Sequence, residues 1–241
     1  MKRHTQAHKP AGKRGDHAES PFWISYADLM TALMVLFLVA LTVALYAVTQ
    51  RDDDNARQTA VRNREIAAFM QRLRQITDQY PGVTLHGTAI DFGERARFRT
   101  DSHRLENEQI HLLRQFVPEV LALAREPLGA RWLKRISVVG YADLRGSYLY
   151  NLNLSLQRSQ RVLCALLVPQ GELPMLEEAE HRQVRQLFIV SGASFNARRD
   201  SAEASRRIEL RLEFLEEDEH GPPPPLPEGE QDKLCPLDLG R

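Results

Sequence analysis

The chain carries the stretch PFWISYADLMTALMVLFLV from Pro21 to Val39, and the apolar run that it opens continues to Val48. Between Leu29 and Val48 there is no charged residue. A helix that rises about 1.5 Å per residue crosses the roughly 30 Å hydrocarbon core of a bilayer in a run of this length. The hydrophobic part of a secretory signal is shorter, about 7–15 residues. The sequence therefore predicts one uncleaved membrane-spanning helix within residues 21–50.

The charges on either side of this helix indicate its orientation. Lysines and arginines precede the helix in residues 1–20, a polar segment that we expect to be a disordered cytoplasmic tail, and Asp52, Asp53 and Asp54 follow it. The positive-inside rule then places the N-terminus in the cytoplasm. We therefore expect a single-pass protein of a bacterial inner membrane whose C-terminal part lies in the periplasm.

Composition and motifs argue against nucleic-acid binding and catalysis. Lysine and arginine number 32, as do aspartate and glutamate, so the net charge is zero and favours no bulk attraction to nucleic acid. The sequence contains no P-loop, HExxH, GxSxG or CxxC motif, and its eight histidines lack the spacing of metal ligands. We therefore expect no enzyme activity, no catalytic or metal-binding residues and no cofactor.

A helical segment follows the predicted membrane helix. In residues 51–81 the apolar side chains Ile66, Phe69, Leu73 and Ile76 recur at helix spacing, a narrow stripe that favours pairing with another helix. This segment is a linker, a dimerising stalk or a plug, and Pro81-Gly82 ends it.

Residues 82–215 predict a compact α+β domain. Apolar runs and helix-spaced stripes alternate along this region. We expect a strand or a hairpin at 83–93, strands at 135–141, 187–191 and 208–214, and helices at 105–125, 148–168 and 175–186. Such an order favours a mixed sheet with helices on one face. Residues 216–241 are acidic, then proline-rich, and predict an extended tail.

One carboxylate, Asp28, lies near the start of the apolar run. An ionised acid inside a membrane costs about 2.5–3.5 kcal/mol on insertion scales, so it normally marks an ion path, a proton relay or a partner contact. The alternative is that Asp28 is hydrated at the interface, near the helix N-terminus, where the helix dipole favours it. Thr31 and Thr42 are candidates to face a partner helix.

A second group of polar residues lies in VVGYADLRGSYLYNLNLSLQRSQRVL, Val138–Leu163. A strand ends near Asp143, and Asn151 and Arg158 share one face of the helix that follows. This set suits a zwitterionic ligand, because Asp143 can take an ammonium, Arg158 a carboxylate and Asn151 a peptide amide. The alternative is an Asp143–Arg158 salt bridge that caps the helix.

The chain has two cysteines, Cys164 and Cys235. In an oxidising periplasm such a pair can form a disulfide, which would hold the C-terminal tail on the domain. The alternative is a buried thiol on a helix and a free thiol in the tail.

The stretch around Asp28 and the stretch around Asp143 and Arg158 each resemble a known family. FWISYADLMT, Phe22–Thr31, resembles the start of the single membrane helix of MotB-type stator subunits. GYADLRGSYLYNLNLSLQR, Gly140–Arg158, resembles the OmpA-like peptidoglycan-binding domain, and the later SRRIEL is similar to the closing strand of that domain. The two resemblances cover about residues 21–50 and 84–215, in the order found in the family.

The resemblance implies an ion-driven rotary stator. Two copies of such a B subunit sit inside a pentamer of MotA-like A subunits, and Asp28 would accept and release a proton or a sodium ion while A rotates around B. The periplasmic domain would hold B still by binding the peptide stem of peptidoglycan. The residues that the resemblance assigns to this binding are Asp143, Tyr150, Asn151, Leu154, Arg158 and Arg207.

Among MotB-type subunits the chain most resembles those of the Zorya anti-phage systems, in FWISYADLMTA, in GSYLYNLNLSLQRS and in SGASFN before the closing strand. The resemblance therefore implies a role in anti-phage defence. Two alternatives stay open. One is a flagellar stator subunit, and the other is a passive tether from membrane to wall with no ion flow.

Overall fold

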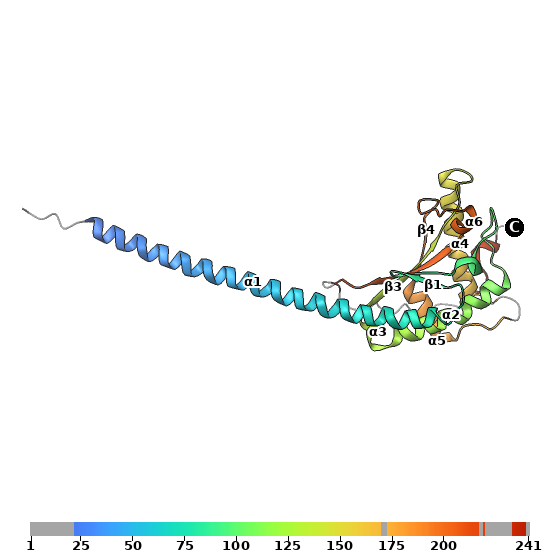
Figure 1. Ribbon diagram of the computed structural model, residues 1–241, viewed down its shortest axis with the longest axis horizontal. Coiled ribbons are helices and arrows are strands. Elements are labelled where there is room, and N and C mark those ends of the chain that lie inside the picture. Colours follow the sequence, from blue (N-terminus) through green and yellow to red (C-terminus); the bar gives the residue numbers. More distant parts are fainter. Residues whose placement is uncertain (1–21, 170–172, 217–218, 220–232, 240–241) are drawn as a thin grey trace, which may run out of the picture. The chain divides into compact units, whose positions relative to one another are not determined.

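The computed structural model describes residues 22–169, 173–216, 219 and 233–239, without the side chains of residues 22–25 and 51–55 (Figure 1). The chain divides into two compact units, Met1–Arg57 and Gln58–Arg241. The cytoplasmic tail predicted at residues 1–20 and the proline-rich part of the C-terminal tail lie outside the described residues.

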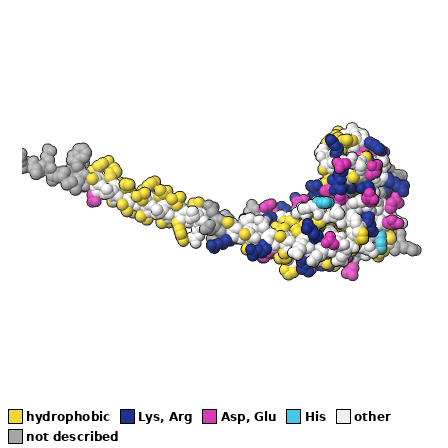
Figure 2. Space-filling view, viewed as in Figure 1, with side chains coloured by type: hydrophobic (Ala, Val, Ile, Leu, Met, Phe, Trp, Pro, Cys, Tyr) yellow, Lys and Arg dark blue, Asp and Glu magenta, His cyan; other side chains and the backbone are white. Residues whose placement is uncertain are grey.

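One helix, α1, runs from Phe22 to Thr77. No glycine or proline occurs in these 56 residues, so nothing in the sequence breaks the helix. Its segment Tyr26–Gln50 is long and apolar enough to cross a membrane. In the most apolar part of this segment, no side chain is buried against the rest of the described chain. Figure 2 shows hydrophobic side chains along this part of the helix, whereas the second unit carries many charged ones.

The last part of α1, residues 58–77, belongs to the second unit. Phe69 and Leu73 are fully buried there, and the ring of Phe69 packs edge-to-face on Phe214 with centroids 5.6 Å apart. The domain boundary expected at residue 82 therefore lies earlier, near Gln58. The narrow apolar stripe of residues 51–81 therefore packs against the domain of the same chain. The sequence pattern alone cannot distinguish this packing from pairing with another helix.

The second unit is built on a five-stranded mixed sheet. Its strands are β1 (Thr84–His86), β2 (Ala89–Asp91), β3 (Leu133–Gly140), β4 (Phe188–Gly192) and β5 (Ile208–Phe214). Their order in the sheet is β1-β2-β5-β3-β4, and all neighbours are antiparallel except β3 and β4. The last strand of the chain thus lies in the centre of the sheet.

Helices cover the apolar face of this sheet. The helices of this unit that follow α1 are α2 (Asn107–Arg125), α3 (Pro127–Trp132), α4 (Tyr148–Leu167), α5 (Glu178–Leu187) and α6 (Ala202–Ser205), with 3₁₀ turns η1 (Gly93–Ala96) and η2 (Pro236–Asp238). Of these, α4 and α5 pack on the sheet, and α2 packs on α4. On β5, Ile208, Leu210 and Leu212 are buried in the core, and the residues between them are Glu209 and Arg211. This alternation is typical of a sheet with one apolar face.

The sequence predicted most of these elements within a few residues. The predicted α+β class, a mixed sheet with helices, is confirmed. Pro118 lies inside α2 without ending it. The short helices α3 and α6 were not predicted, because neither is long enough to show a helical repeat.

Helix α4 crosses the ends of β3 and β4 in direct backbone contact. A Cβ atom on Gly140 would lie 1.9 Å from the carbonyl oxygen of Ser155, and one on Gly192 would lie 2.7 Å from the Ser155 hydroxyl. Only glycine permits this approach. The contact fixes the start of α4 beside the loop that follows β3.

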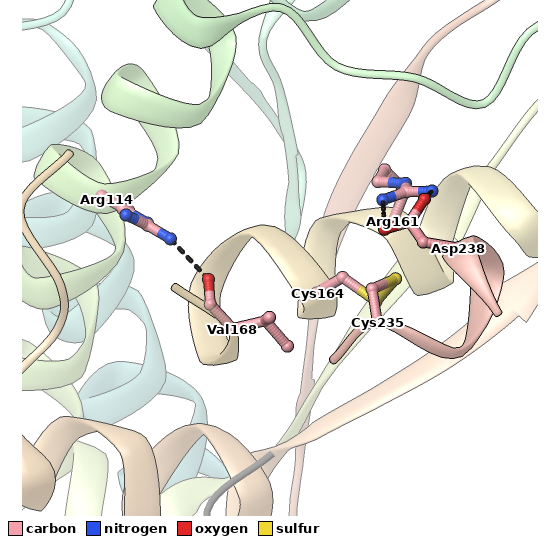
Figure 3. Close-up of a disulfide and its surroundings, with 6 residues drawn as sticks. All are labelled: Arg114, Arg161, Cys164, Val168, Cys235 and Asp238. Atoms are coloured by element: carbon pink, nitrogen blue, oxygen red, sulfur yellow. Dashed lines mark hydrogen bonds and ion pairs between the residues drawn. A yellow bond between two sulfur atoms is a disulfide. The ribbon is translucent and has the colours of Figure 1, made fainter. Parts of the chain in front are cut away.

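The C-terminal segment is held on α4 by two contacts (Figure 3). Cys164 and Cys235 form a disulfide, with Cα atoms 5.4 Å apart. Arg161 donates two hydrogen bonds, of 2.9 and 2.8 Å, to the two carboxylate oxygens of Asp238. Of the two alternatives for the cysteines, the bonded pair is the one present, and residues 233–239 are docked rather than extended.

The packing of α1 predicts a difference between two apolar residues of the same helix. We expect Leu73→Ala to reduce the free energy of unfolding by about 2–5 kcal/mol, because it leaves a cavity in the core. Val61 is 47% exposed, so Val61→Ala should change the free energy by less than about 0.5 kcal/mol. Thermal unfolding of the full-length protein in detergent measures both. Equal effects would mean that α1 does not contribute to the core.

The disulfide predicts a second stability difference. It joins residues 71 positions apart, so its loss should destabilise the domain by about 2–4 kcal/mol. The double variant Cys164→Ser, Cys235→Ser should therefore melt at a lower temperature than the oxidised wild type, and the reduced wild type should melt with the variant. Two free thiols in mass spectra of unreduced protein would contradict the bond.

Candidate functional site

Asp28 is exposed on the apolar segment of α1. Among the described residues its carboxylate has neither a hydrogen-bond donor nor an ion-pair partner, whereas its backbone carbonyl accepts a hydrogen bond of 2.9 Å from the Thr31 hydroxyl. The Thr42 hydroxyl donates in the same way, at 2.8 Å, to the carbonyl of Val39. Both threonines are thus satisfied within their own helix, whereas the Asp28 carboxylate has no partner among the described residues.

A cavity of about 280 Å³ lies at the N-terminal end of α4, and we call it the Arg158 pocket. Residues from three segments line it: Thr100, Asp101, Asp143, Arg145, Gly146, Tyr150, Asn151, Leu154 and Arg158. Five of the six residues that the resemblance assigns to peptidoglycan binding are therefore brought together. The sixth, Arg207, is not part of the lining.

Arg158 is fully buried and forms the base of this pocket. Its guanidinium donates to three backbone carbonyls, those of Ser102 (2.9 Å), Tyr141 (2.7 Å) and Arg99 (3.3 Å). It also lies 5.1 Å from the centre of the Phe98 ring. Three of the five N–H groups of the guanidinium are used inside the domain, so at most two can reach a ligand.

The charge of Arg158 is kept in spite of its burial. Burial lowers the pKa of Arg158 to about 10, while the carboxylates of Asp143 and Asp101 act in the opposite direction. A pKa of about 10 leaves the guanidinium protonated near neutral pH. The pocket therefore holds a fixed positive charge at its base.

Asp143 pairs with Arg206, and not with Arg158. The Arg206 guanidinium donates to Asp143 Oδ2 at 2.9 Å, and the backbone N–H of Arg145 donates to Oδ1 at 3.0 Å. Burial acts to raise the pKa of Asp143, but these hydrogen bonds outweigh burial, so the pKa lies below its ordinary value. The carboxylate is therefore ionised, and each of its oxygens already accepts one hydrogen bond.

The predicted cap formed by an Asp143–Arg158 salt bridge is absent from the described residues. The cap of α4 is Ser147, whose hydroxyl accepts a hydrogen bond of 3.3 Å from the backbone N–H of Tyr150. This is the ordinary role of serine before a helix.

The other lining residues hold the pocket walls. Asn151 is buried, and its amide donates at 2.8 Å to the carbonyl of Arg145, which fixes the loop after β3. Gly146 in that loop has a φ of 93°, which glycine adopts readily. The hydroxyl of the half-exposed Tyr150 donates to Asp101 across the pocket mouth.

Arg207 contacts other groups. Its Nε donates to Glu209 at 2.8 Å, and its guanidinium lies 4.0 Å from the centre of the Tyr141 ring. The residue that sequence reasoning missed is Arg206, which pairs with Asp143. The alternation along the closing strand is a signal that could have found Arg206. If the alternation is continued backwards from β5, Arg206 falls on the same face as the core residue Ile208, whereas Arg207 falls on the face of Glu209.

Comparison with known proteins identifies relatives of the N-terminal segment and of most of the chain. A family described as membrane MotB of the proton-channel complex MotA/MotB matches residues 3–62. The Zorya protein ZorB of Escherichia coli O139:H28 is 44% identical over 207 residues, which cover 84% of this chain and 84% of that protein. The chain belongs to the ZorB family. It is therefore a MotB-like B subunit of a Zorya stator, with one N-terminal transmembrane helix.

Solved structures similar to this chain include an OmpA-like domain and a MotB periplasmic domain. The OmpA-like domain of FopA1 from Francisella tularensis is 19% identical with a TM-score of 0.34, and covers 56% of this chain and 82% of that one. The periplasmic domain of MotB from Helicobacter pylori is 13% identical with a TM-score of 0.39, and covers 56% of this ZorB-family chain and 83% of that one.

The bonds of Arg158 predict a large loss of stability when it is removed. We expect Arg158→Ala to reduce the free energy of unfolding by about 3 kcal/mol, because one buried and two partly buried hydrogen bonds to backbone carbonyls are lost. For a domain of this size that lowers the melting temperature by roughly 6–12 °C. Arg145→Ala is the matched control, because this arginine lines the same pocket but is exposed. Similar melting temperatures for the two variants would contradict the structural role of Arg158.

Proposed function

We propose that the chain is the peptidoglycan-anchored B subunit of an ion-driven rotary stator that acts in anti-phage defence. Asp28 carries the ion, a proton or a sodium ion, and the Arg158 pocket binds the peptide stem of the cell wall. The N-terminus lies in the cytoplasm and the second unit in the periplasm. No catalytic group, metal or cofactor takes part.

The observation that carries the ion-transport part is the position of Asp28. A carboxylate on an apolar membrane segment is costly unless a partner or an ion compensates it, and the described residues of this chain offer no partner. In a complex, alternate protonation and release would change the contact between this helix and the A subunits. A charge that crosses the full membrane potential gains about 2.3 kcal/mol per 100 mV, which can drive rotation.

The wall-binding part rests on the charges of the Arg158 pocket. The ionised carboxylate of Asp143 and the guanidinium of Arg158 both line the pocket, so its wall carries charges of both signs and suits a ligand with an ammonium and a carboxylate. Amino-acid residues with both groups are found in the peptides of bacterial cell walls. Two B chains inside a pentamer of MotA-like A subunits would then be held still against the wall while the A subunits rotate.

The proposal predicts that phage protection needs both sites. In a host that carries the whole operon, Asp28→Asn should abolish protection, because asparagine keeps the size of the side chain but cannot cycle a charge. Thr42→Val is the matched control on the same helix and should protect. Plaque counts at equal expression and equal membrane insertion measure both. If Asp28→Asn protects as well as wild type, the chain is a tether without ion flow.

The pocket needs a variant that leaves the fold intact. Thr100 is exposed and lines the pocket, so Thr100→Arg should fill the cavity and repel an ammonium without removing a buried contact. We expect Thr100→Arg to lose protection and to lose binding to isolated cell walls, while Thr100→Ser keeps both. Full wall binding by Thr100→Arg would place the wall ligand elsewhere.

A further inference from the structure

A second cavity, of about 290 Å³, lies beside the Arg158 pocket. The loop after β3, Asp143–Arg145, lines one side of it, and the segment Arg198–Ala202 lines another. Its volume is near the lower end of the range for small-ligand sites. Of the residues that the resemblance assigns to peptidoglycan binding, only Asp143 lines this cavity, and none of the roles proposed above uses the cavity.

The two cavities share a wall. Asp143 and Arg145 line both of them, so a ligand that occupies one lies within a few atoms of the other. Asn151 fixes this shared loop through the carbonyl of Arg145. One extended ligand can therefore contact both cavities without a change in the backbone.

Two guanidinium groups of the second cavity are available to a ligand. Arg199 is already paired with Asp91 at 2.5 Å and with Glu209 at 3.4 Å. By contrast, the side chains of Arg145 and Arg198 are exposed, and neither has a hydrogen bond or an ion pair among the described residues. Two such arginines favour a carboxylate, which a guanidinium can bind through two parallel hydrogen bonds.

The remaining lining residues narrow the class of ligand. Asp200 is an acceptor next to the two arginines, and it suits an N–H group close to the bound carboxylate. Leu144 and Ala202 supply apolar surface for a small side chain. A carboxylate, a neighbouring peptide N–H and a small apolar side chain are the parts of the last residue of a peptide.

We propose that the second cavity binds the C-terminal residue of the wall peptide, through Arg145 and Arg198 to its carboxylate and Asp200 to its peptide N–H. This inference rests on the proposed function, because it assumes that the same peptide places its zwitterionic residue in the Arg158 pocket. It adds a preference for stems with a free C-terminus over stems whose C-terminus is linked to another peptide.

The test uses the full-length protein in detergent and two synthetic tetrapeptides of cell-wall sequence. One ends in the free carboxylate of D-alanine and the other in D-alanine amide. Wild type should bind the acid about tenfold more tightly than the amide, the effect of one charge-assisted contact. Arg198→Gln should lose most of this preference, because only Arg145 then remains to bind the carboxylate. Arg182→Gln, on the exposed face of α5, is the matched control and should keep the tenfold preference.

Each other outcome overturns the inference. Equal binding of acid and amide by wild type, or a tenfold preference that survives in Arg198→Gln, removes the C-terminal site but leaves wall binding in place. If wild type binds neither peptide, the wall-binding function itself fails and the C-terminal site fails with it. Arg198→Gln has no bond to lose among the described residues, so its melting temperature should equal that of wild type.

Discussion

The buried guanidinium of Arg158 is the interaction on which the periplasmic unit depends. It ties α4 to the end of β3 through Tyr141 and to the segment 99–102, which has no regular secondary structure. Because the same segment supplies Thr100 and Asp101 to the pocket, the group that gives the pocket its positive charge also holds its wall. The proposed binding and the stability of the unit therefore depend on one residue, and substitutions of Arg158 alone cannot separate them.

The account joins two needs of a rotary machine in one chain. Ion passage needs a carboxylate on the membrane helix, and useful rotation needs one part to be held still. Asp28 and the core residue Leu73 belong to the same uninterrupted helix, α1, so the membrane segment continues into the folded domain without a loop. In the ZorB family, to which the chain belongs, the proposed wall contact would give the A subunits something to turn against.

Local sequence patterns predicted most helices and strands, but they did not predict which distant residues contact one another. The alternation on β5 and the stripe on α2 follow from one buried face, so they can be read from the sequence. The partner of Asp143 could not be read from helix spacing, because Arg206 lies between α6 and β5, 63 residues away in the sequence. The cover of Phe69 and Leu73 was equally hidden, because a stripe reports that a face is buried but not what buries it. The sheet order, with the last strand central, also depends on pairing between distant segments.

Ion flux tests the central claim most directly. The purified complex of A and B subunits would be placed in vesicles, with a potassium diffusion potential and dyes for protons and for sodium. The account predicts flux of one of these ions through the wild-type complex, and none above the empty-vesicle level with Asp28→Asn, at equal reconstitution and with assembly of the complex intact. Equal flux through both complexes would contradict the account, because the ion would then cross without Asp28.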